Sequence, residues 1–457
     1  MSDWSEIKKS VLERIKPSRT EEVTLNEIGD QITEKINSIL KLEGIKGIAE
    51  IHGSVPHGTW IRGQMDIDVF IVLDTYQERE QLAEALNAIR KHTDWEFTEA
   101  WAEHPYLQTE IEGYNLDIVP CFRARNEERI RSSTDRTPLH TKWLKKRLFR
   151  KGNEVRLLKQ FLNVIEIYGA EIKVGGFSGY LCELLIIKHR SFMGLIKTAS
   201  GWGEKVIIKF NEETREFDDP LVVYDPVDSS RNVASALREE SFNLFISAVK
   251  AFRDDPSERF FTFDETPVDV DELMEKIGER NLVFIVIEES KAEVPDTLWG
   301  QLRRSTGAIE KQLEIQGFDV IKSTAWSNEK TRHILAYILV SAQRTQTIKH
   351  YGPPARLEKN VEKFLEIYTD NPNVVSGPDI ENNRWFVVLF REHTLIKDTI
   401  DRLLGDGGLS SGVSRRIAVR ILQHHRVLIG KAIGPYLVEG FERHLAKFIR
   451  GRPFWVE

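Results

Sequence analysis

Gly53-Ser54 is followed about a dozen residues later by Asp66-Ile67-Asp68-Val69-Phe70-Ile71-Val72-Leu73, the stretch that decides the fold. Ile, Val and Phe favour a β-strand, in which successive side chains alternate between the two faces. Asp66 and Asp68 are therefore expected on the same face. Two carboxylates one pleat apart repel each other, and on an otherwise apolar strand they need a cation to offset that repulsion.

A second short apolar run, residues 115–119, carries one more carboxylate, Asp117. If this run is a neighbouring strand, Asp117 supplies a third hard oxygen ligand. Three such ligands suit Mg²⁺, which keeps waters and recruits substrate phosphates to complete its octahedron. In two-metal chemistry a pair of such ions stabilises the attacking and the leaving oxygen of an in-line displacement. We therefore predict a magnesium site at Asp66, Asp68 and Asp117.

The Gly-Ser pair follows an apolar segment, residues 47–51, where a strand can pass into a turn and then a helix. Glycine lets backbone amides approach a phosphate, and the Ser54 hydroxyl adds a donor. Each motif is common when alone, because most Gly-Ser pairs are only turns and an Asp-x-Asp on a surface strand is usually solvated. The ordered set of Gly-Ser, Asp-x-Asp and a later strand aspartate is far more specific.

This ordered set resembles the active site of the polymerase-beta nucleotidyltransferase superfamily. The wider sequence resembles the archaeal-type (class I) CCA-adding enzymes, which are tRNA nucleotidyltransferases. The similar stretches in the first half of the chain are residues 102–106, 116–121, 135–140, 153–159, 167–171, 176–184, 225–228 and 231–234. Beyond Arg231 the similarity thins to fragments such as residues 351–353 and 384–386, so there the resemblance concerns architecture.

The resemblance implies an α+β multidomain fold with a polymerase-beta-like nucleotidyltransferase head, a helical middle domain and αβ C-terminal domains. The expected boundaries are 1–136 for the catalytic head, 137–262 for the nucleotide-recognising neck, 263–316 plus 393–457 for the body, and 317–392 for a tail that holds the tRNA elbow. A length of 457 residues is too great for one core and fits several domains.

Hydrophobic patterns along the chain predict the main elements. Helices are expected over 5–42 with a break at Pro17-Ser18, and over 77–92, 153–168 and 295–314; strands are expected over 282–287 and 385–390. Thr24 is a candidate N-cap for the second helix, and Gly169 is a candidate C-cap for the helix that begins near residue 153.

The resemblance also implies an activity: template-independent addition and repair of the 3′-terminal CCA of tRNA from CTP and ATP, with release of pyrophosphate. Asp66, Asp68 and Asp117 correspond to the catalytic, metal-binding carboxylates. The positions that match nucleotide contacts are Ser54, His57, His140, Lys159, Tyr168 and Arg231. Taken singly, these have simpler explanations: a solvated helix lysine, a tyrosine lid, a histidine at a helix start, and an arginine paired with Asp225 or Asp228.

Arg231 corresponds to a residue that resembles a base reader. Cytosine and adenine share an exocyclic amino donor beside a ring-nitrogen acceptor, whereas uracil and guanine present a carbonyl and an N–H there. A fixed guanidinium, together with RNA backbone acceptors, would therefore accept both wanted bases. Two positions depart from the family pattern, since His57 stands where Arg or Lys is common and Asp66 stands where Glu is frequent.

The charge distribution is compatible with RNA binding despite a formal net charge of −7. Residues 141–160 hold eight Lys or Arg against one acid, and residues 411–457 hold nine against three. On charge alone, solvated helix faces are the better explanation of such runs, but beside the catalytic motif a track for the tRNA acceptor stem and elbow becomes the better interpretation. The family resemblance also implies a homodimer.

The remaining composition points to a cytoplasmic protein. Two cysteines cannot build a disulfide framework, which fits a reducing compartment. No apolar stretch approaches the ~20 residues that a spanning helix needs, and the N-terminus does not resemble a signal peptide.

Two rival functions remain open from the sequence. A poly(A) or poly(U) tailing polymerase would share the head chemistry and a similar Gly-Gly-Phe-Ser-Gly element at residues 175–179. A noncatalytic RNA-binding scaffold with a relic head is the second, although a relic has no physical reason to keep a repulsive carboxylate cluster.

Overall fold

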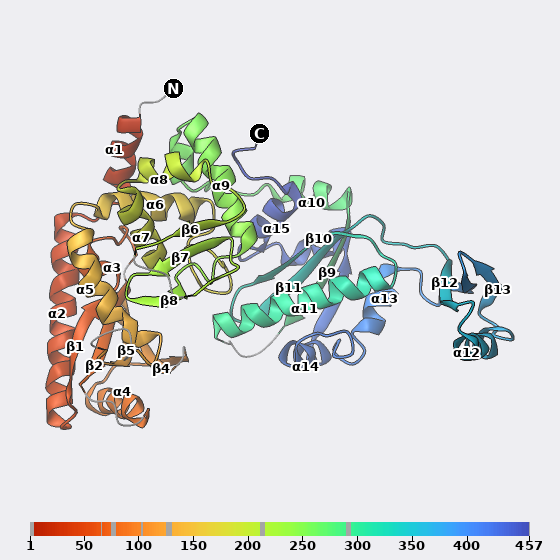
Figure 1. Cartoon of the computed structure of the whole chain (residues 1–457), viewed down its shortest axis with the longest axis horizontal. Coiled ribbons are helices and arrows are strands. Elements are labelled where there is room, and N and C mark those ends of the chain that lie inside the picture. The colour runs from red at the N-terminus through yellow and green to blue at the C-terminus, as the bar shows by residue number, and fades with distance from the viewer. Residues whose placement is uncertain are drawn as a thin grey trace. The chain divides into compact units, whose positions relative to one another are not determined.

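The computed structural model describes residues 4–64, 66–74, 79–101, 104–124, 130–210, 215–288 and 294–456 (Figure 1). Gln77, Ala102 and Glu103, which belong to the ranges 77–92 and 102–106 named above, lie outside the described residues. The chain forms two compact units, an N-terminal unit of residues 1–265 with 453–457 and a C-terminal unit of residues 266–452.

The N-terminal unit begins with two helices and a five-stranded mixed sheet. The helices are α1 (Trp4–Ile15) and α2 (Arg19–Leu42), and the strands, in spatial order, are β1 (Gly47–His52), β2 (Asp66–Leu73), β5 (Tyr114–Phe122), β4 (Pro105–Ile111) and β3 (Thr98–Trp101). Strands β2 and β5 are parallel, and the other neighbours are antiparallel. The strand predicted over residues 66–73 is therefore confirmed, and Asp117 lies on its neighbour.

The two faces of β2 have different environments. Ile67, Val69 and Ile71 pack into a core with α2 and with α4 (Glu80–His92). Phe70 and Val72 belong to the opposite face, which Asp68 shares by the two-residue period of a strand. An apolar face thus anchors the strand while the other face presents its carboxylates.

The predicted break between the first two helices is confirmed, but the expected cap is wrong. Ser18 caps α2: its hydroxyl accepts from the Glu21 amide while the Glu21 carboxylate accepts from the Ser18 amide. This reciprocal capping box starts the helix earlier, so Thr24 lies within it.

The remainder of the N-terminal unit is mainly helical, with a small sheet. It contains α5 (Thr137–Arg147), α6 (Gly152–Val164), α7 (Gly179–His189), α8 (Phe192–Ala199), α9 (Glu239–Asp254), and β6 (Val206–Ile208), β7 (Leu221–Asp225) and β8 (Asp228–Asn232). Aromatic rings fill its core, where Phe161 contacts Phe192, Phe252 and Phe260 with ring centroids 5.6–5.7 Å apart. This packing holds α6, which supplies a lysine to the site described below.

The helix predicted over 153–168 ends earlier, at Val164, and Gly169 is not its cap. Glu166 adopts a positive φ of 63°, and the chain then turns so that Tyr168 forms a bridge with Phe177. The apolar stripe continues past the helix end because Ile165 and Ile167 stay buried in the same core. Tertiary pairing therefore overrides the helical period here.

The C-terminal unit is built on an antiparallel sheet with helices on both faces. The strand order is β10 (Val320–Ser327), β11 (Arg332–Leu339), β9 (Asn281–Glu288) and β15 (His425–Ile429). One face packs against α11 (Pro295–Ile315), α13 (Ile396–Leu403) and α14 (Arg415–Gln423), and the other against α10 (Val270–Gly278) and α15 (Phe441–Arg450). Figure 1 shows α11 lying across β9 and β11.

A three-stranded sheet in the same unit joins β12 (Thr347–Pro354), β14 (Arg384–Phe390) and β13 (Val374–Glu381), with α12 (Glu358–Tyr368) packed against β12. The predicted α+β multidomain class is confirmed, as are the expected elements near residues 282–287, 295–314 and 385–390. Among the described helices, none combines the length and apolar character needed to cross a membrane.

Candidate active site

The Gly-Ser turn is pressed against the first strand carboxylate. Gly53 directly follows β1 with φ 74° and ψ −147°, and Ser54 begins the short helix α3 (Ser54–His57). A Cβ atom on Gly53 would lie 2.1 Å from Oδ2 of Asp68, which is far inside any real contact. Glycine is therefore required twice, for its backbone angle and for its missing side chain.

Three carboxylates lie on β2 and β5, two neighbouring inner strands of the head sheet. In the parallel register Asp68 is opposite Asp117, and Asp66 is opposite Asn115. The Asp117 carboxylate accepts a hydrogen bond of 3.0 Å from Gln108, and the Asp66 carboxylate accepts one of 2.9 Å from Asn115. The predicted clustering on adjacent strands is thus present in the fold.

The carboxylates disfavour one another's ionised form. Burial, followed by the negative charges of Asp117 and Asp66, raises the pKa of Asp68 to about 6, while the positive charge of Lys159 opposes the rise. Burial also raises the pKa of Asp117. Such a site is costly when empty of positive charge and favourable when a cation is present.

A pocket of about 450 Å³ brings together most of the predicted site residues. Those on its wall are Ser54, His57, Asp66, Asp68, Asp117, His140, Lys159 and Tyr168. A second pocket, of about 570 Å³, is also lined by the same three carboxylates, together with residues of β4 and β5 such as Gln108 and Asn115. The carboxylates therefore border two pockets at once.

Lys159 is the buried cation of the site. It projects from α6 with 2% of its surface exposed, and desolvation lowers its pKa while Glu183 and Asp68 favour its charged form. Tyr168 lies beside it, with the lysine Nζ 5.9 Å from the ring centroid. Helix α6 ends at Val164, and the chain that follows it brings Tyr168 to this position. Gly176 packs tightly against this chain, since a Cβ on Gly176 would lie 2.0 Å from the carbonyl oxygen of Ile167.

Glu183 connects the Gly-Ser turn to the helical part of the unit. Its Oε1 lies 3.0 Å from Nδ1 of His57 and accepts a 2.7 Å hydrogen bond from the Thr59 hydroxyl. It also lines the pocket beside Lys159. Sequence reasoning missed Glu183 as a site residue; a buried carboxylate within the apolar run of α7 was the signal that pointed to it.

His140 reaches the pocket from α5, and the start of that helix is fixed by Asp135. The buried Asp135 carboxylate accepts from the Phe122 amide at 2.8 Å and from the Arg131 and Ser132 amides at 3.1 Å. These bonds fasten the end of β5 to the segment that begins α5. The Asp135 side chain thereby ties β5, the strand of Asp117, to the start of α5, the helix of His140.

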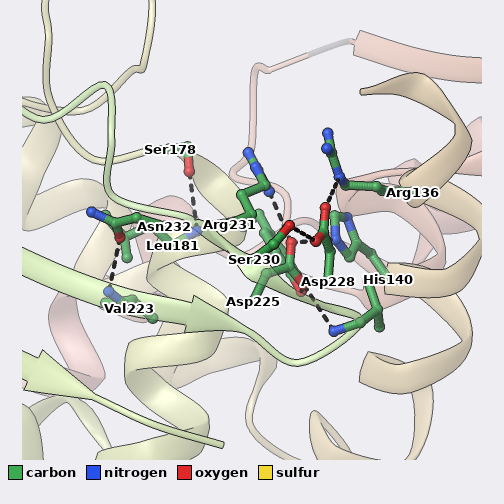
Figure 2. Close-up of polar contacts among 12 residues, drawn as sticks. Arg136, His140, Ser178, Leu181, Val223, Asp225, Asp228, Ser230, Arg231 and Asn232 are labelled. Carbon is green, nitrogen blue, oxygen red and sulfur yellow. Dashed lines mark hydrogen bonds and ion pairs between the residues drawn. The ribbon is translucent and has the colours of Figure 1, made fainter. Parts of the chain in front are cut away.

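Arg231 differs from the other predicted residues, because it is not among the described residues that line the 450 Å³ pocket. Its guanidinium NH1 donates to Oδ2 of Asp225 at 2.9 Å, as in one of the simpler explanations above. Nε2 of His140 lies 2.9 Å from the same oxygen (Figure 2). Arg231 is thus linked to the pocket through Asp225, which sequence reasoning did not place in the site.

Comparisons with known proteins decide the family. Family models match as "tRNA nucleotidyltransferase, second domain" over residues 153–262 and "CCA-adding enzyme, C-terminal domain" over 280–430. A curated CCA-adding enzyme of Pyrobaculum neutrophilum is 35% identical over 94% of this chain and 99% of its own. The chain belongs to the CCA-adding enzyme family. The resemblance stated from the sequence motifs is therefore confirmed, and the protein is a tRNA nucleotidyltransferase.

Other relatives of this CCA-adding enzyme have similar coverage. The CCA-adding enzyme of Methanosarcina mazei is 34% identical over 90% of this chain and 92% of its own, and that of Halobacterium salinarum is 32% identical over 98% and 99%. Residues 1–145 also match the "Second Messenger Oligonucleotide or Dinucleotide Synthetase domain". The solved structure of E. coli MS115-1 CdnC with ATP covers 56% of this chain and 94% of its own at 16% identity, with a TM-score of 0.45, a likeness that carries no argument.

The family of CCA-adding enzymes implies a dependence on divalent metal. Among the described residues, no group of three His, Cys, Asp or Glu side chains has an arrangement that could hold a metal ion. The donor chemistry nevertheless fits one: three carboxylates face the same pockets, and burial together with the charges of the other two raises the pKa of Asp68. Hard oxygen donors of this kind are those that Mg²⁺ prefers.

Proposed function

We propose that the two pockets beside Asp66, Asp68 and Asp117 are the places where this CCA-adding enzyme holds its two substrates. The 450 Å³ pocket would take CTP or ATP, and the 570 Å³ pocket would take the 3′ end of the tRNA. The observation that carries the proposal is that the same three carboxylates line both pockets. A group transfer between two substrates needs its catalytic groups at the border between them.

Asp66, Asp68 and Asp117 would hold Mg²⁺, which when bound supplies positive charge to the attacking and leaving oxygens. Asp117 is proposed to support deprotonation of the terminal ribose hydroxyl. The freed oxygen forms a bond to the α-phosphorus, the bond from that phosphorus to the β-phosphate bridging oxygen breaks, and pyrophosphate leaves with the electron pair. The proton passes to solvent by way of the carboxylate.

The triphosphate would be bound by the positive and hydroxyl groups of the first pocket. Lys159 is the best supported of these, because an almost fully buried ammonium is costly unless an anion compensates it. The Ser54 hydroxyl and the His57 ring lie on the same pocket wall, and Tyr168 is next to Lys159. We assign them to phosphate and ribose contacts, with His57 in the place of the family's usual Arg or Lys.

Base selection is assigned to Arg231 and His140. A guanidinium presents donors in a fixed plane, which suits the ring-nitrogen acceptor shared by cytosine and adenine. The Arg231 side chain is 34% exposed, so part of it is accessible. Because His140 and Arg231 contact the same oxygen of Asp225, we assign base selection to the two residues together.

The larger architecture follows the family expectation. We propose a head of residues 1–136, a neck of 137–262, a body of 263–316 plus 393–457, and a tail of 317–392. The basic residues of α5 would follow the acceptor stem, and those of α14 and α15 the tRNA elbow. We also propose a homodimer in the cytoplasm, where both cysteines, free and buried, would stay reduced.

The test is a product-length assay with the full chain, Mg²⁺ and a tRNA transcript that lacks its terminal CCA. With CTP alone we expect extension to stop at two nucleotides, and with CTP and ATP at three. A long ladder of one nucleotide would instead identify a tailing polymerase. Failure to extend the transcript under varied metal and salt conditions would favour the noncatalytic scaffold.

A further inference from the structure

Asp225 is a buried carboxylate on which three side chains converge. It is fully buried at the end of β7, and its Oδ2 lies 2.9 Å from both NH1 of Arg231 and Nε2 of His140. Its Oδ1 accepts a 3.2 Å hydrogen bond from the hydroxyl of Tyr180. Figure 2 shows Arg231 and His140 approaching Asp225 from different elements, β8 and α5.

The carboxylate itself is held in place by its own hairpin. The Val227 amide donates to Oδ1 of Asp225 at 3.0 Å, so the turn between β7 and β8 fixes the side chain. At the other end of the hairpin, the buried Asn232 accepts from the Val223 amide and donates to the Leu221 carbonyl. Asp225 is therefore an anchor that its partners cannot easily displace.

Its charge is compensated by the same partners. Burial acts to raise the pKa of Asp225, but the hydrogen bond and charge of His140, the Val227 amide and the Arg231 charge together lower it. An ionised carboxylate is a strong acceptor for guanidinium and imidazole groups. Removing the charge of Asp225 would thus weaken its contacts with both Arg231 and His140.

The partners of Asp225 face the nucleotide pocket to different degrees. His140 and Tyr180 line the pocket, and their rings stack with centroids 4.0 Å apart. Arg231 is not among the described residues that line it, and it joins this group through its contact with Asp225. One carboxylate thereby sets the placement of the pocket wall and of the proposed base reader relative to each other.

We propose that Asp225 is a positioning residue for nucleotide selection, and that it aligns Arg231, His140 and Tyr180 so that CTP and ATP are accepted and UTP and GTP rejected. The proposal rests on the assignment of Arg231 to base selection above. A merely structural Asp225 would support the hairpin and affect every nucleotide equally. A positioning role therefore predicts a change in the ratio of kcat/KM for CTP to kcat/KM for UTP when Asp225 is substituted, whereas a merely structural role predicts no change in that ratio.

The chain provides a matched control in the same hairpin. Asp228 is also buried, at 5% exposure, and its carboxylate accepts from Arg136 and Ser230 at 2.7 Å each (Figure 2). Neither Arg136 nor Ser230 is among the described residues on the wall of the nucleotide pocket. Asp228→Asn removes a buried, paired charge from the same turn without touching the group formed by Asp225.

The experiment measures kcat/KM for single additions of C and of U to a tRNA transcript that lacks CCA, with the full chain and Mg²⁺. For Asp225→Asn we expect the CTP-to-UTP ratio of kcat/KM to fall by about tenfold or more. This is the size of effect expected when one charge-assisted hydrogen bond is lost. Asp228→Asn should keep the wild-type ratio within about twofold. A wild-type chain that adds no C would refute the proposed function itself, separately from this inference.

An equal fall in kcat/KM for CTP and UTP in Asp225→Asn would overturn the positioning role. If that variant does not fold, as judged by its thermal transition, Tyr180→Phe takes its place, because it removes one donor to Asp225 and keeps the ring stacked on His140. It should lower the ratio by about threefold. An unchanged ratio in folded Tyr180→Phe would likewise count against the proposal.

Discussion

Gly53 leaves no room for a side chain next to Asp68, since a Cβ at this position would lie 2.1 Å from the carboxylate oxygen Oδ2. The turn that is proposed to receive the triphosphate and the strand that is proposed to bind metal are therefore in direct contact. A change in one moves the other. This relation explains why the Gly-Ser pair and the Asp-x-Asp pair act as a single motif.

Gly53→Ala should lower the rate of CMP transfer about 100-fold while leaving the enzyme folded. The backbone conformation of Gly53, with φ 74° and ψ −147°, costs alanine about 1–3 kcal/mol, and the clash displaces Asp68. A displacement near 1 Å lowers the rate about 100-fold. Gly58→Ala is the matched control, because Gly58 has φ 64° and no atom within 4 Å of an added Cβ. Single-turnover CMP transfer should be nearly normal in Gly58→Ala; equal losses in the two variants would contradict the account.

Asp68→Asn should stabilise the metal-free protein at neutral pH. The folded state raises the pKa of Asp68 from 3.8 to about 6, so ionisation costs folding free energy in full above about pH 6, and the cost disappears below about pH 4. Removing the ionisable group should add up to about 3 kcal/mol to the unfolding free energy at pH 7.5 in chelator. Urea unfolding at pH 4 and 7.5 measures this difference, and Mg²⁺ should narrow it. A variant that is less stable than the wild type at pH 7.5 would contradict the unfavourable ionisation of Asp68 described here.

Lys159→Met should weaken nucleotide use without weakening tRNA binding. A charge-assisted contact to a phosphate is worth about 1.5–3 kcal/mol, so kcat/KM for CTP should fall about 10- to 150-fold. Lys188→Met, which changes an exposed lysine on α7 that donates to the Lys209 carbonyl, is the control and should be neutral. Steady-state kinetics and filter binding separate the two effects. Reduced tRNA affinity with an unchanged KM for CTP would show that Lys159 binds the RNA and not the triphosphate.

The local part of the site was predictable because it depends on short periods. Alternation along residues 66–73 places Asp66 and Asp68 on one face, and a second apolar run carries Asp117. The relation of Asp68 to Asp117 was less predictable, since it depends on the parallel register of β2 and β5, and that register is set by the whole sheet.

Contacts between distant segments could not be predicted from any local pattern. Glu183 meets His57 across 126 positions of sequence, and Asp225 meets His140 across 85. The end of α6 was misplaced for a related reason, because the bridge between Tyr168 and Phe177 ends the helix while the apolar stripe continues. Such features depend on tertiary packing, which propensity and period do not encode.

The most direct test of the account compares CMP transfer and tRNA binding in Asp68→Ala. Asp74→Ala is the control, because Asp74 follows β2 directly, is exposed and pairs with Arg123. With Mg²⁺, CTP and a tRNA transcript lacking CCA, we expect Asp68→Ala to lose at least about 1,000-fold in transfer rate while its tRNA affinity stays within about twofold of the wild type. Asp74→Ala should retain both. Rapid transfer by Asp68→Ala would contradict the assignment of the carboxylate site.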